Sequence, residues 1–280
     1  MVLPALVLLL VFSYSPIFKT IQLSLFGTDL LGNPTRYVGF DYYVEMFTEP
    51  DMFRVLATTV LITVGSAALA IGGGLLAVLP LSRLPKGGKF FSVVFSLPFA
   101  FSAAAASACF AGLLAPSVGT LNSILAGFGI QGPGWLQSGP WAIASIIATT
   151  AWYEFGFTVL VLVAATRNMP IEVLEAARLD GAGEFRLAWS VILPLISPTL
   201  LFLTITQTIS GLQIFTQVQV LTRGGPAGST QTLVYQLYEL AFAGGVADVG
   251  RASTFALLLL VLVAAISAVQ YAIINRRVTS

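Results

Sequence analysis

The chain has 280 residues, of which 57% are hydrophobic and 9% are charged, and its mean hydropathy is +0.92. Soluble domains carry roughly a quarter charged residues, so this composition excludes a soluble protein and indicates an integral membrane protein. The net charge of +1 and the absence of a polybasic run exclude nucleic acid as a partner and a basic surface anchor.

Six apolar segments are long enough to cross a membrane, because a hydrocarbon core about 30 Å thick needs roughly 20 apolar residues per helix. The runs are continuous rather than alternating, which favours helices over a β-barrel. The sequence therefore predicts a single all-α domain over residues 1–280, with six transmembrane helices. Their approximate ranges are 3–26, 53–81, 90–115, 141–166, 191–221 and 253–274.

The first segment begins at Met1 without a basic flank, whereas a signal peptide needs a basic n-region. Because the run is long enough to span, we interpret it as a retained helix. Because the basic flank is missing, the sequence also leaves open that a short segment precedes Met1.

The connecting segments predict the orientation. Cytoplasmic loops carry an excess of Lys and Arg, and three segments fit: the second loop, the fourth loop and the C-terminus. The basic residues are Arg83, Lys86 and Lys89, then Arg167, Arg178 and Arg186, and finally Arg276 and Arg277. The first connector is acidic and the third carries no charge, so both are assigned outside. The sequence thus predicts a multi-pass bacterial inner-membrane protein with both termini in the cytoplasm.

Several kinds of chemistry are excluded. The chain has no histidine, which removes the commonest general base and any His-ligated zinc, and no phosphate-binding loop of the form GxxxxGK[ST] is present. We expect no metal, no cofactor and no catalytic residue on this chain. The glycines at 72–74 predict close helix packing, and the lone Cys109, inside an apolar run, predicts a buried, inert thiol.

Residues 175–198 form a charged island between two apolar segments. Pro170 suits the first turn of a helix, residues 171–180 then favour a short helix, and Gly181 is its predicted stop. Ala176, Ala177 and Asp180 occupy adjoining positions of that helix and predict a shallow surface on which another protein can lie close. Further on, prolines at 194 and 198 predict a kink where the chain passes from water into lipid.

This island resembles the EAA loop of ATP-binding-cassette importer permeases, whose pattern is E-A-A, three residues, Gly, nine residues, an aliphatic, one residue, L-P. The matching residues are Glu175, Ala176, Ala177, Gly181, Val191, Leu193 and Pro194. The resemblance implies that residues 167–190 form a cytoplasmic coupling loop between helices 4 and 5. It implies that Glu175, Ala176, Ala177, Asp180 and Gly181 meet an ATPase subunit and carry the stroke of ATP binding into the membrane.

A second run, L-T-R-G-G-P at residues 221–226, followed by T-L-V at 232–234 and A-F at 241–242, is similar to the maltose and glycerol-phosphate branch of these permeases. That family usually has Gly or Asp where Arg223 stands. The branch imports sugars, oligosaccharides, polyols and glycerophosphate compounds.

Helix spacing predicts where a solute would lie, since positions i, i+3, i+4 and i+7 share one face. In the resembling permeases the solute contacts come from the fourth and fifth helices. The positions that match are Thr150, Tyr153, Glu154 and Phe157 on the fourth, and Gln207, Ser210, Gly211 and Ile214 on the fifth. Gln213 and Gln217 lie on another face of the fifth, where packing and cavity roles both remain open.

Glu154 stands out among these positions, because an ionisable side chain at membrane depth costs a few kcal/mol and rarely faces lipid. We expect it to line a polar cavity, with a structural hydrogen bond between helices as the alternative. A carboxylate accepts hydrogen bonds from hydroxyls, and Tyr153 or Trp152 offers a flat face to a sugar ring or to a quaternary ammonium group. Like charges repel, which disfavours a phosphate monoester and favours sugars or a choline-like phosphodiester.

The resemblance implies half of a translocation pathway and a set of partners. These are a homologous second permease, two ATPase subunits that hold ATP and Mg, an extracellular solute-binding protein, a small polar solute and membrane lipid. The acidic first connector and the segment from Arg223 to Arg251 are the candidate contacts for the binding protein. The alternatives are an ion-coupled secondary transporter, which an intramembrane glutamate would suit, and an intramembrane enzyme.

Overall fold

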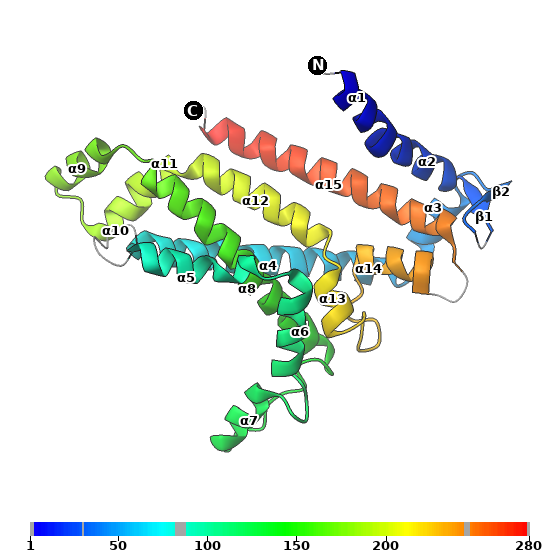
Figure 1. The fold of residues 1–280 in the computed structure, drawn as a ribbon, viewed down its shortest axis with the longest axis horizontal. Coiled ribbons are helices and arrows are strands. Elements are labelled where there is room, and N and C mark those ends of the chain that lie inside the picture. The colour runs from blue at the N-terminus through cyan, green and yellow to red at the C-terminus, as the bar shows by residue number, and fades with distance from the viewer. Residues whose placement is uncertain (1–2, 30, 82–87, 244–246, 279–280) are drawn as a thin grey trace.

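The computed structural model describes residues 3–29, 31–81, 88–243 and 247–278. Four helices are long and apolar enough to cross a membrane, at Pro4–Leu23, Met52–Leu79, Gly139–Arg167 and Val249–Ala272. Two further pairs of helices pass the same test together but are bent, so the number of spans is between four and six. In Figure 1 the helices at Met52–Leu79 and Val249–Ala272 run roughly along the long axis of the molecule, whereas Pro4–Leu23 and Gly139–Arg167 run obliquely to it.

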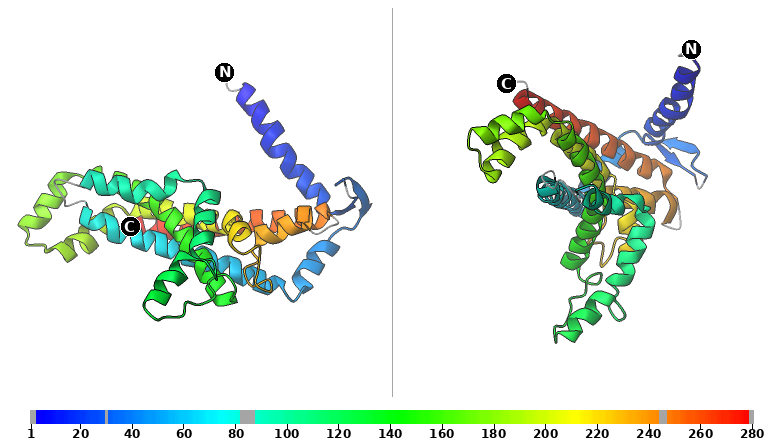
Figure 2. Two further views of the ribbon diagram at one scale, coloured as in Figure 1. Left: turned by 60° about the horizontal axis from the view of Figure 1, so that its bottom comes forward. Right: turned by 60° about the vertical axis from the view of Figure 1, so that its left-hand side comes forward.

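The N-terminal segment consists of α1 (Leu3–Leu9), a π-helical turn (Leu10–Tyr14) and α2 (Ser15–Leu23). It projects away from the rest of the chain in both views of Figure 2. Strands β1 (Phe26–Thr28) and β2 (Pro34–Tyr37) form an antiparallel hairpin, followed by α3 (Asp41–Thr48). Asp29 fixes the hairpin turn by accepting hydrogen bonds from the backbone of Leu31 and Asn33. Hydrogen bonds from Asn33 hold the pKa of the Asp29 carboxyl below its usual value.

Helices α4 (Met52–Leu81) and α8 (Gly139–Arg167) form the centre of the molecule and pack along each other. Their close approach explains two of the three glycines at 72–74. A Cβ on Gly74 would lie 2.5 Å from Cγ2 of Thr158, and one on Gly73 would contact the Phe155 ring at 3.5 Å. A Cβ on Gly72 would meet nothing within 4 Å. The packing prediction is therefore confirmed for Gly73 and Gly74 and wrong for Gly72.

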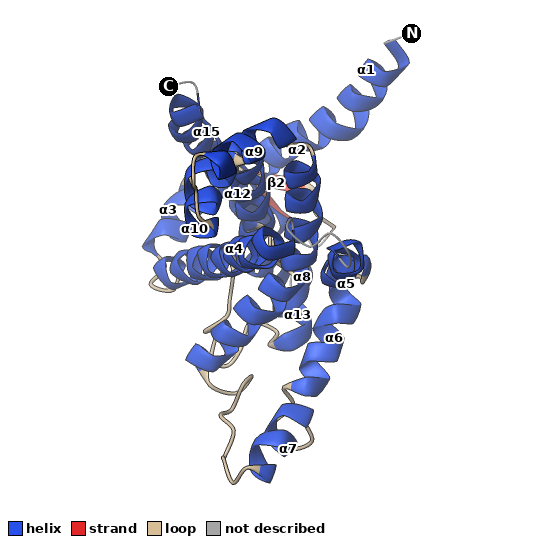
Figure 3. Cartoon of the chain, turned by 90° about the vertical axis from the view of Figure 1, so that its left-hand side faces the viewer, coloured by secondary structure: helices blue, strands red, loops and turns tan. Residues whose placement is uncertain are grey.

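The predicted third span is not one helix. It consists of α5 (Gly88–Ala100) and α6 (Ala103–Leu113), whose axes differ by 92°. Pro98 lies in the last turn of α5, and Ser102 caps α6 by accepting a hydrogen bond from the Ala105 N–H at 3.1 Å. A proline followed four residues later by an N-cap serine is a local signal for this break. Helix α7 (Thr120–Gly127) follows and projects away from the long helices (Figure 3).

Cys109 lies on α6 and is exposed on the surface of the chain, so the prediction of a buried thiol is wrong. The buried face of this helix is formed by Ala106 and Ser107. Apolar neighbours in a membrane sequence do not imply burial in protein, because a lipid-facing surface is equally apolar.

The charged island follows α8 and lies at one end of the molecule, the α9 end (Figure 1). It contains α9 (Ile171–Leu179), α10 (Glu184–Leu187), a π-helical turn (Ala188–Ile192) and α11 (Leu193–Leu195). Helix α12 (Ser197–Leu212) comes next, and Glu184–Leu195 and Ser197–Leu212 are bent by 69° at their junction. The predicted kink at the two prolines is thereby confirmed.

The C-terminal part comprises α13 (Thr216–Leu221), α14 (Leu233–Tyr238), a π-helical turn (Glu239–Ala243) and α15 (Val249–Val278). Helix α13 packs against α6, and α15 packs against α12, α14 and α2. The β-hairpin and α3 lie beside the start of α15, at the end of the long axis opposite α9 (Figure 1). We refer to this as the hairpin end.

Three apolar clusters fill the interior along the long axis. One, near the α9 end, is centred on Val159, Leu162 and Leu203. A middle cluster contains Ile62, Ile146 and Ile214, and a third, at the hairpin end, contains Met46, Leu233 and Phe255. Helices α4, α8 and α12 share the first cluster.

Candidate functional site

The four predicted solute positions on the fourth span all lie in the middle of α8, and the structure brings them beside α5 and α12. Thr150 is buried, and Tyr153, Glu154 and Phe157 are partly buried. Thr150 Oγ1 has no hydrogen-bond partner among the described residues. A buried hydroxyl without a protein partner usually binds water or a ligand.

Four rings from three helices meet at this level, and we refer to Phe99, Tyr153, Phe157 and Phe202 as the aromatic cluster. The ring centroids of Phe99 and Phe157 are 5.2 Å apart, those of Phe99 and Tyr153 are 6.1 Å apart, and those of Phe157 and Phe202 are 6.5 Å apart. The cluster therefore joins α5, α8 and α12. Beside this cluster α5 and α8 approach each other closely at Gly156. A Cβ on Gly156 would lie 2.6 Å from the backbone nitrogen of Phe99.

A chain of polar contacts connects α12 with α8 next to Glu154. The Gln207 amide donates to Thr158 Oγ1, and that hydroxyl donates to the backbone carbonyl of Glu154 at 2.9 Å. Gln207 is 2% exposed, and its Oε1 has no partner among the described residues. These two hydrogen bonds, through Thr158, connect the backbone of Glu154 with α12. The sequence left two uses open for the Glu154 side chain, lining a cavity or forming an interhelical hydrogen bond. The interhelical hydrogen bond at this level joins Gln207 and Thr158.

The other three predicted positions on the fifth span differ in their surroundings. Ser210 is exposed, whereas Gly211 packs so closely on α4 that its Cβ would lie 2.9 Å from Cα of Thr63. Ile214 is buried with Ile62 and Ile146. It also lies beyond the last residue of α12, so the predicted continuous stripe from 207 to 214 is wrong. The helix ends at Leu212 and restarts at Thr216, while Ile214 packs into the middle cluster.

The two glutamines that follow have separate environments. Gln213 is exposed and lines a shallow groove with Ala256, Leu260 and Ala264 of α15. Gln217 is buried on α13. The structure thus assigns Gln217 to packing and leaves Gln213 at the surface.

Two apolar grooves flank the C-terminal half of α8, between the aromatic cluster and the α9 end. One has a volume of about 650 Å³ and lies between α5 and α8, with Ser96, Leu160 and Arg167 in its lining. The other, of about 500 Å³, lies between α8 and α12 and includes Ala164 and Phe202. Both volumes fall within the range of small-molecule sites, and both grooves are bounded by the exposed side of Leu160 and Ala164.

The five predicted coupling residues surround the end of α9, at the tip of the α9 end. Glu175, Ala176, Asp180 and Gly181 are exposed, but Ala177 packs against the cluster formed by Val159 and Leu162. The two alanines therefore do not share one exposed surface. Leu179, which the sequence did not single out, is 89% exposed and supplies the apolar part of that surface.

The predicted stop at Gly181 is confirmed, and its geometry is that of a Schellman motif. Gly181 has φ +76°, its N–H donates to Arg178 O, and the next N–H, of Ala182, donates to Ala177 O, both at 3.0 Å. The left-handed conformation favours glycine at this position. The motif gives α9 a sharp end and sets the direction of the chain toward α10.

The loop after α13 contains the second motif and folds back on α4 and α14. Gly224 has φ +77°, and a Cβ there would lie 2.7 Å from the Tyr235 ring, so both dihedral and space favour glycine. Arg223 has φ +50°, a conformation that costs a non-glycine residue roughly 1–2 kcal/mol. This explains why Gly or Asp suits that position better than Arg. Thr230 closes the loop by donating to Gly225 O at 2.7 Å.

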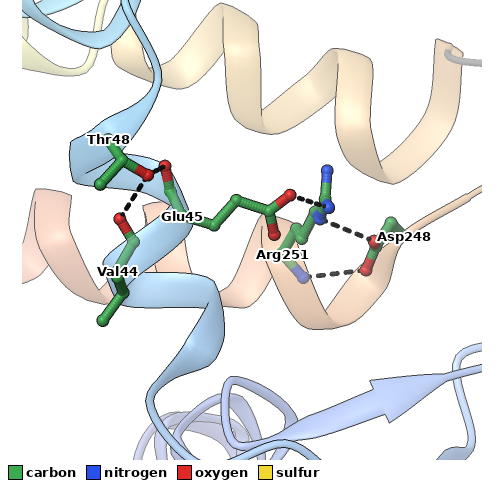
Figure 4. A network of polar contacts seen from close by, with 5 residues as sticks. All are labelled: Val44, Glu45, Thr48, Asp248 and Arg251. Carbon is green, nitrogen blue, oxygen red and sulfur yellow. Dashed lines mark hydrogen bonds and ion pairs between the residues drawn. The ribbon is translucent and has the colours of Figure 1, made fainter.

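An ion network holds the hairpin end together (Figure 4). Arg251 forms ion pairs with Glu45 of α3 and with Asp248, the latter at 3.4 Å, and its guanidinium lies 5.8 Å from the centre of the Tyr42 ring. Asp248 also caps α15 by accepting from the Arg251 N–H at 3.0 Å. The two segments predicted to meet a binding protein are therefore neighbours, and Glu45 and Arg251 compensate each other's charge.

Sequence reasoning missed three contributors to this region, namely Phe99, Thr158 and Phe202. Thr158 was recognisable as the position one helical turn after Glu154, on the same face. The two phenylalanines carry no such signal, because aromatic residues are frequent in all the apolar segments and only the packing of α5 and α12 on α8 selects these two.

Together, these observations describe a membrane protein whose helices are joined by polar contacts and which carries an exposed helix at one end. The chain belongs to the family described as binding-protein-dependent transport system inner membrane component, whose model matches residues 70–280. This family membership favours a permease over the two alternatives, an ion-coupled carrier and an intramembrane enzyme.

Named relatives match over almost their whole length. A probable ABC transporter permease protein of Bacillus subtilis is 32% identical, with 95% of this chain and 92% of the relative covered. The sulfoquinovosyl glycerol transport system permease protein of Agrobacterium fabrum is 31% identical, with 98% and 89% covered. The sn-glycerol-3-phosphate transport system permease protein of the same organism is 29% identical, with 99% and 94% covered.

Among solved structures, a chain of a bacterial alginate ABC transporter, crystallised with an alginate pentasaccharide-bound periplasmic protein, has a TM-score of 0.87. Its sequence identity is 21%, and the match covers 100% of this chain and 94% of that one. The similarity establishes a shared fold.

Proposed function

We propose that this chain is one permease subunit of an ATP-driven, binding-protein-dependent importer and forms half of the translocation pathway for a sugar, polyol or glycerophosphodiester-type solute. Residues 1–280 act as one transmembrane domain, in which residues 167–190 couple to the ATPase. The following paragraphs give the support for each part.

The position of α9 carries the proposal. This helix is exposed at the tip of the molecule, ends in a Schellman motif at Gly181 and continues through a 69° bend into α12. Helix α12 in turn contacts α4 and reaches Glu154 through Gln207 and Thr158. A push on α9 is therefore applied to the same element that contacts the polar centre of the molecule.

The basic residues at the α9 end support an orientation of the chain in the membrane. We place the α9 end, with Arg167, Arg178 and Arg186, in the cytoplasm by the positive-inside rule. The hairpin end is then outside. Both termini are assigned to the cytoplasm, as an even number of spans requires. The predicted basic residues Arg83 and Lys86 lie outside the described residues, so they add nothing to this assignment from the structure.

The pathway runs along α8. Thr150 lies on the outer side of the aromatic cluster, Glu154 lies level with it, and the two grooves beside Leu160 and Ala164 lie on the cytoplasmic side. The grooves are open on one side, so a second, homologous permease subunit is needed to enclose a passage. The aromatic cluster separates the two regions in this conformation.

The solute class follows from the groups that face the pathway. Glu154 accepts hydrogen bonds from hydroxyls, and Tyr153 presents a ring. A carboxylate in a low dielectric repels a phosphate monoester, which favours a neutral sugar or polyol, or a phosphodiester with a choline-like cation. The solutes for which two relatives are named, sulfoquinovosyl glycerol and sn-glycerol-3-phosphate, are hydroxylated, although the second is a phosphate monoester.

Three further partners complete the complex. Two ATPase subunits, which hold ATP and Mg, meet Glu175, Ala176, Asp180 and Gly181 of α9, while Ala177 supports that surface from below. An extracellular solute-binding protein docks at the hairpin end, where Asp41 and Glu49 remain exposed after Glu45 has paired with Arg251. Closure of the ATPases draws the two coupling helices together and opens the pathway outward, and hydrolysis resets it.

The proposal is tested by purifying the chain with its partners and measuring ATPase activity in liposomes with maltose, glycerol, glycerophosphocholine or sn-glycerol-3-phosphate, each with the binding protein. We expect stimulation by a sugar, a polyol or the phosphodiester. Purification without an ATPase, or uptake driven by an ion gradient alone, would contradict the importer. Stimulation by the monoester only would contradict the solute class.

Replacing Glu154 by alanine is expected to reduce uptake roughly 10- to 100-fold, because a hydrogen bond to a charged group contributes about 1.5–3 kcal/mol. The yield of the assembled complex should not change, since no described residue bonds to the Glu154 carboxylate. Glu154→Gln keeps the size of the side chain and should have an intermediate effect. Initial uptake rates over a range of solute concentrations measure this, and normal kinetics of Glu154→Ala would remove Glu154 from the pathway.

A further inference from the structure

A row of four aromatic rings extends along α13, α14 and the π-helical turn that follows. The centroids of Phe215 and Tyr238 are 4.9 Å apart, those of Tyr235 and Tyr238 are 6.2 Å apart, and those of Tyr238 and Phe242 are 5.8 Å apart. Tyr235, Tyr238 and Phe242 recur at the spacing of one helix face. We refer to these four residues as the aromatic row.

The two ends of the row have different surroundings. Phe215 and Tyr235 belong to the middle apolar cluster and are held there by packing. Tyr238 is partly exposed and Phe242 is 77% exposed. Phe215 directly follows Ile214, the last position predicted to meet solute. The row thus extends from the surface into the middle apolar cluster, and its exposed rings are Tyr238 and Phe242.

Polar groups accompany the rings on the same helix face. Glu239 lies one turn after Tyr235, and its Oε2 accepts a hydrogen bond from the Gln231 amide at 2.9 Å. Within the described part of the chain the Tyr238 hydroxyl has no hydrogen-bond partner. Packing alone would not require a carboxylate, an amide and a free phenol beside a row of rings.

This combination matches the chemistry of a sugar or a polyol. The C–H groups of a sugar carry small positive charges and pack on the negative face of an aromatic ring. Its hydroxyls are donors and acceptors for a carboxylate, an amide and a phenol. An extended row lets a molecule exchange one ring for the next without losing all its contacts at once.

We propose that the aromatic row is an outer binding track, whose exposed rings, Tyr238 and Phe242, hold a neutral sugar or polyol after its release from the binding protein. This inference rests on the proposed function and adds to it a second contact site for the solute, separate from the positions on α8 and α12. An uncharged, hydroxyl-rich solute is favoured on the track, because the Glu239 carboxylate would repel a phosphate monoester.

The test uses the reconstituted complex with maltose, glycerol and glycerophosphocholine as separate probes, each delivered by the binding protein. Phe242→Ala and Tyr238→Ala are expected to raise the KM for uptake about fivefold, with the maximal ATPase rate unchanged. Tyr238→Phe keeps the ring and should remain within about twofold of the unmodified chain. Phe47→Ala is the matched control, because Phe47 is also exposed at the hairpin end but contacts no ring of the row.

Phe242→Ala keeps the experiment decisive if Tyr238→Ala folds poorly, since an exposed ring contributes little to folding. An unchanged KM for Phe242→Ala, or an equal rise for Phe47→Ala, would overturn the track. A lower maximal rate at constant KM would indicate a structural role and would also overturn it. If Glu154→Ala impairs uptake while both row variants do not, the track fails and the proposed function stands.

Discussion

The Gly156→Ala variant is expected to lose most of its folded yield, which is a large effect on stability. The added Cβ would lie 2.6 Å from the backbone nitrogen of Phe99 and 3.0 Å from Ser96 O. Backbone atoms cannot rotate away, so α5 and α8 must separate and the aromatic cluster must open. Overpacking of this kind costs about 1–3 kcal/mol or more. The amount of monodisperse protein in detergent and its thermal midpoint measure the loss.

Gly72→Ala is the matched control for this experiment. It makes the same substitution inside another long helix, at a position where a Cβ meets nothing within 4 Å. Alanine favours a helix over glycine by roughly 1 kcal/mol, so this variant should be at least as stable as the unmodified chain. Equal yields and midpoints for the two variants would show that α5 and α8 do not approach as closely as described.

The Leu179→Gln variant is expected to lose its ATPase subunits during purification, which is the largest effect on function. Leu179 is 89% exposed at the end of α9, next to the predicted coupling residues. Burying a leucine side chain in an interface contributes about 1.5–3 kcal/mol, and a polar glutamine at this position removes that contribution. Glutamine remains a good helix former, so the fold of α9 should persist. The ratio of ATPase to permease after affinity purification measures the loss, and uptake should fall with it.

Leu31→Gln is the control for this second experiment. Leu31 is 86% exposed, nearly the same as Leu179, but it lies in the β-hairpin turn at the opposite end of the molecule. The same substitution there should leave the ATPase content unchanged. Retention of both ATPase subunits by Leu179→Gln would contradict docking through this surface, and an equal loss in Leu31→Gln would point to general instability.

The long spans were predictable to within a few residues. The ranges 53–81, 141–166 and 253–274 correspond to α4, α8 and α15, because a continuous apolar run of this length has one favourable conformation in lipid. The third span was predicted as continuous although Pro98 and Ser102 marked its break. The kink at Pro194 and Pro198 was predicted correctly, since a proline removes a backbone hydrogen bond wherever it lies in a helix.

The candidate site was predictable only in part. Thr150, Tyr153, Glu154 and Phe157 do lie on one face of α8, because the helix there is unbroken, while their contact with solute stays a prediction. The same reasoning failed for Ile214, since α12 ends at Leu212 and no proline marks that end. Ala177 was assigned to the exposed surface, yet it packs inward.

The sequence by itself determined the membrane location, the family motifs and the charged island, because hydropathy and residue spacing act locally along the chain. Only the tertiary structure decided which rings meet in the aromatic cluster, that Thr158 connects Glu154 with Gln207, and that Gly74, Gly156 and Gly211 are points of close approach. In a membrane protein nearly every surface is apolar, so hydrophobicity does not distinguish a protein contact from a lipid contact. That distinction depends on how neighbouring helices cross, which only the packed structure specifies.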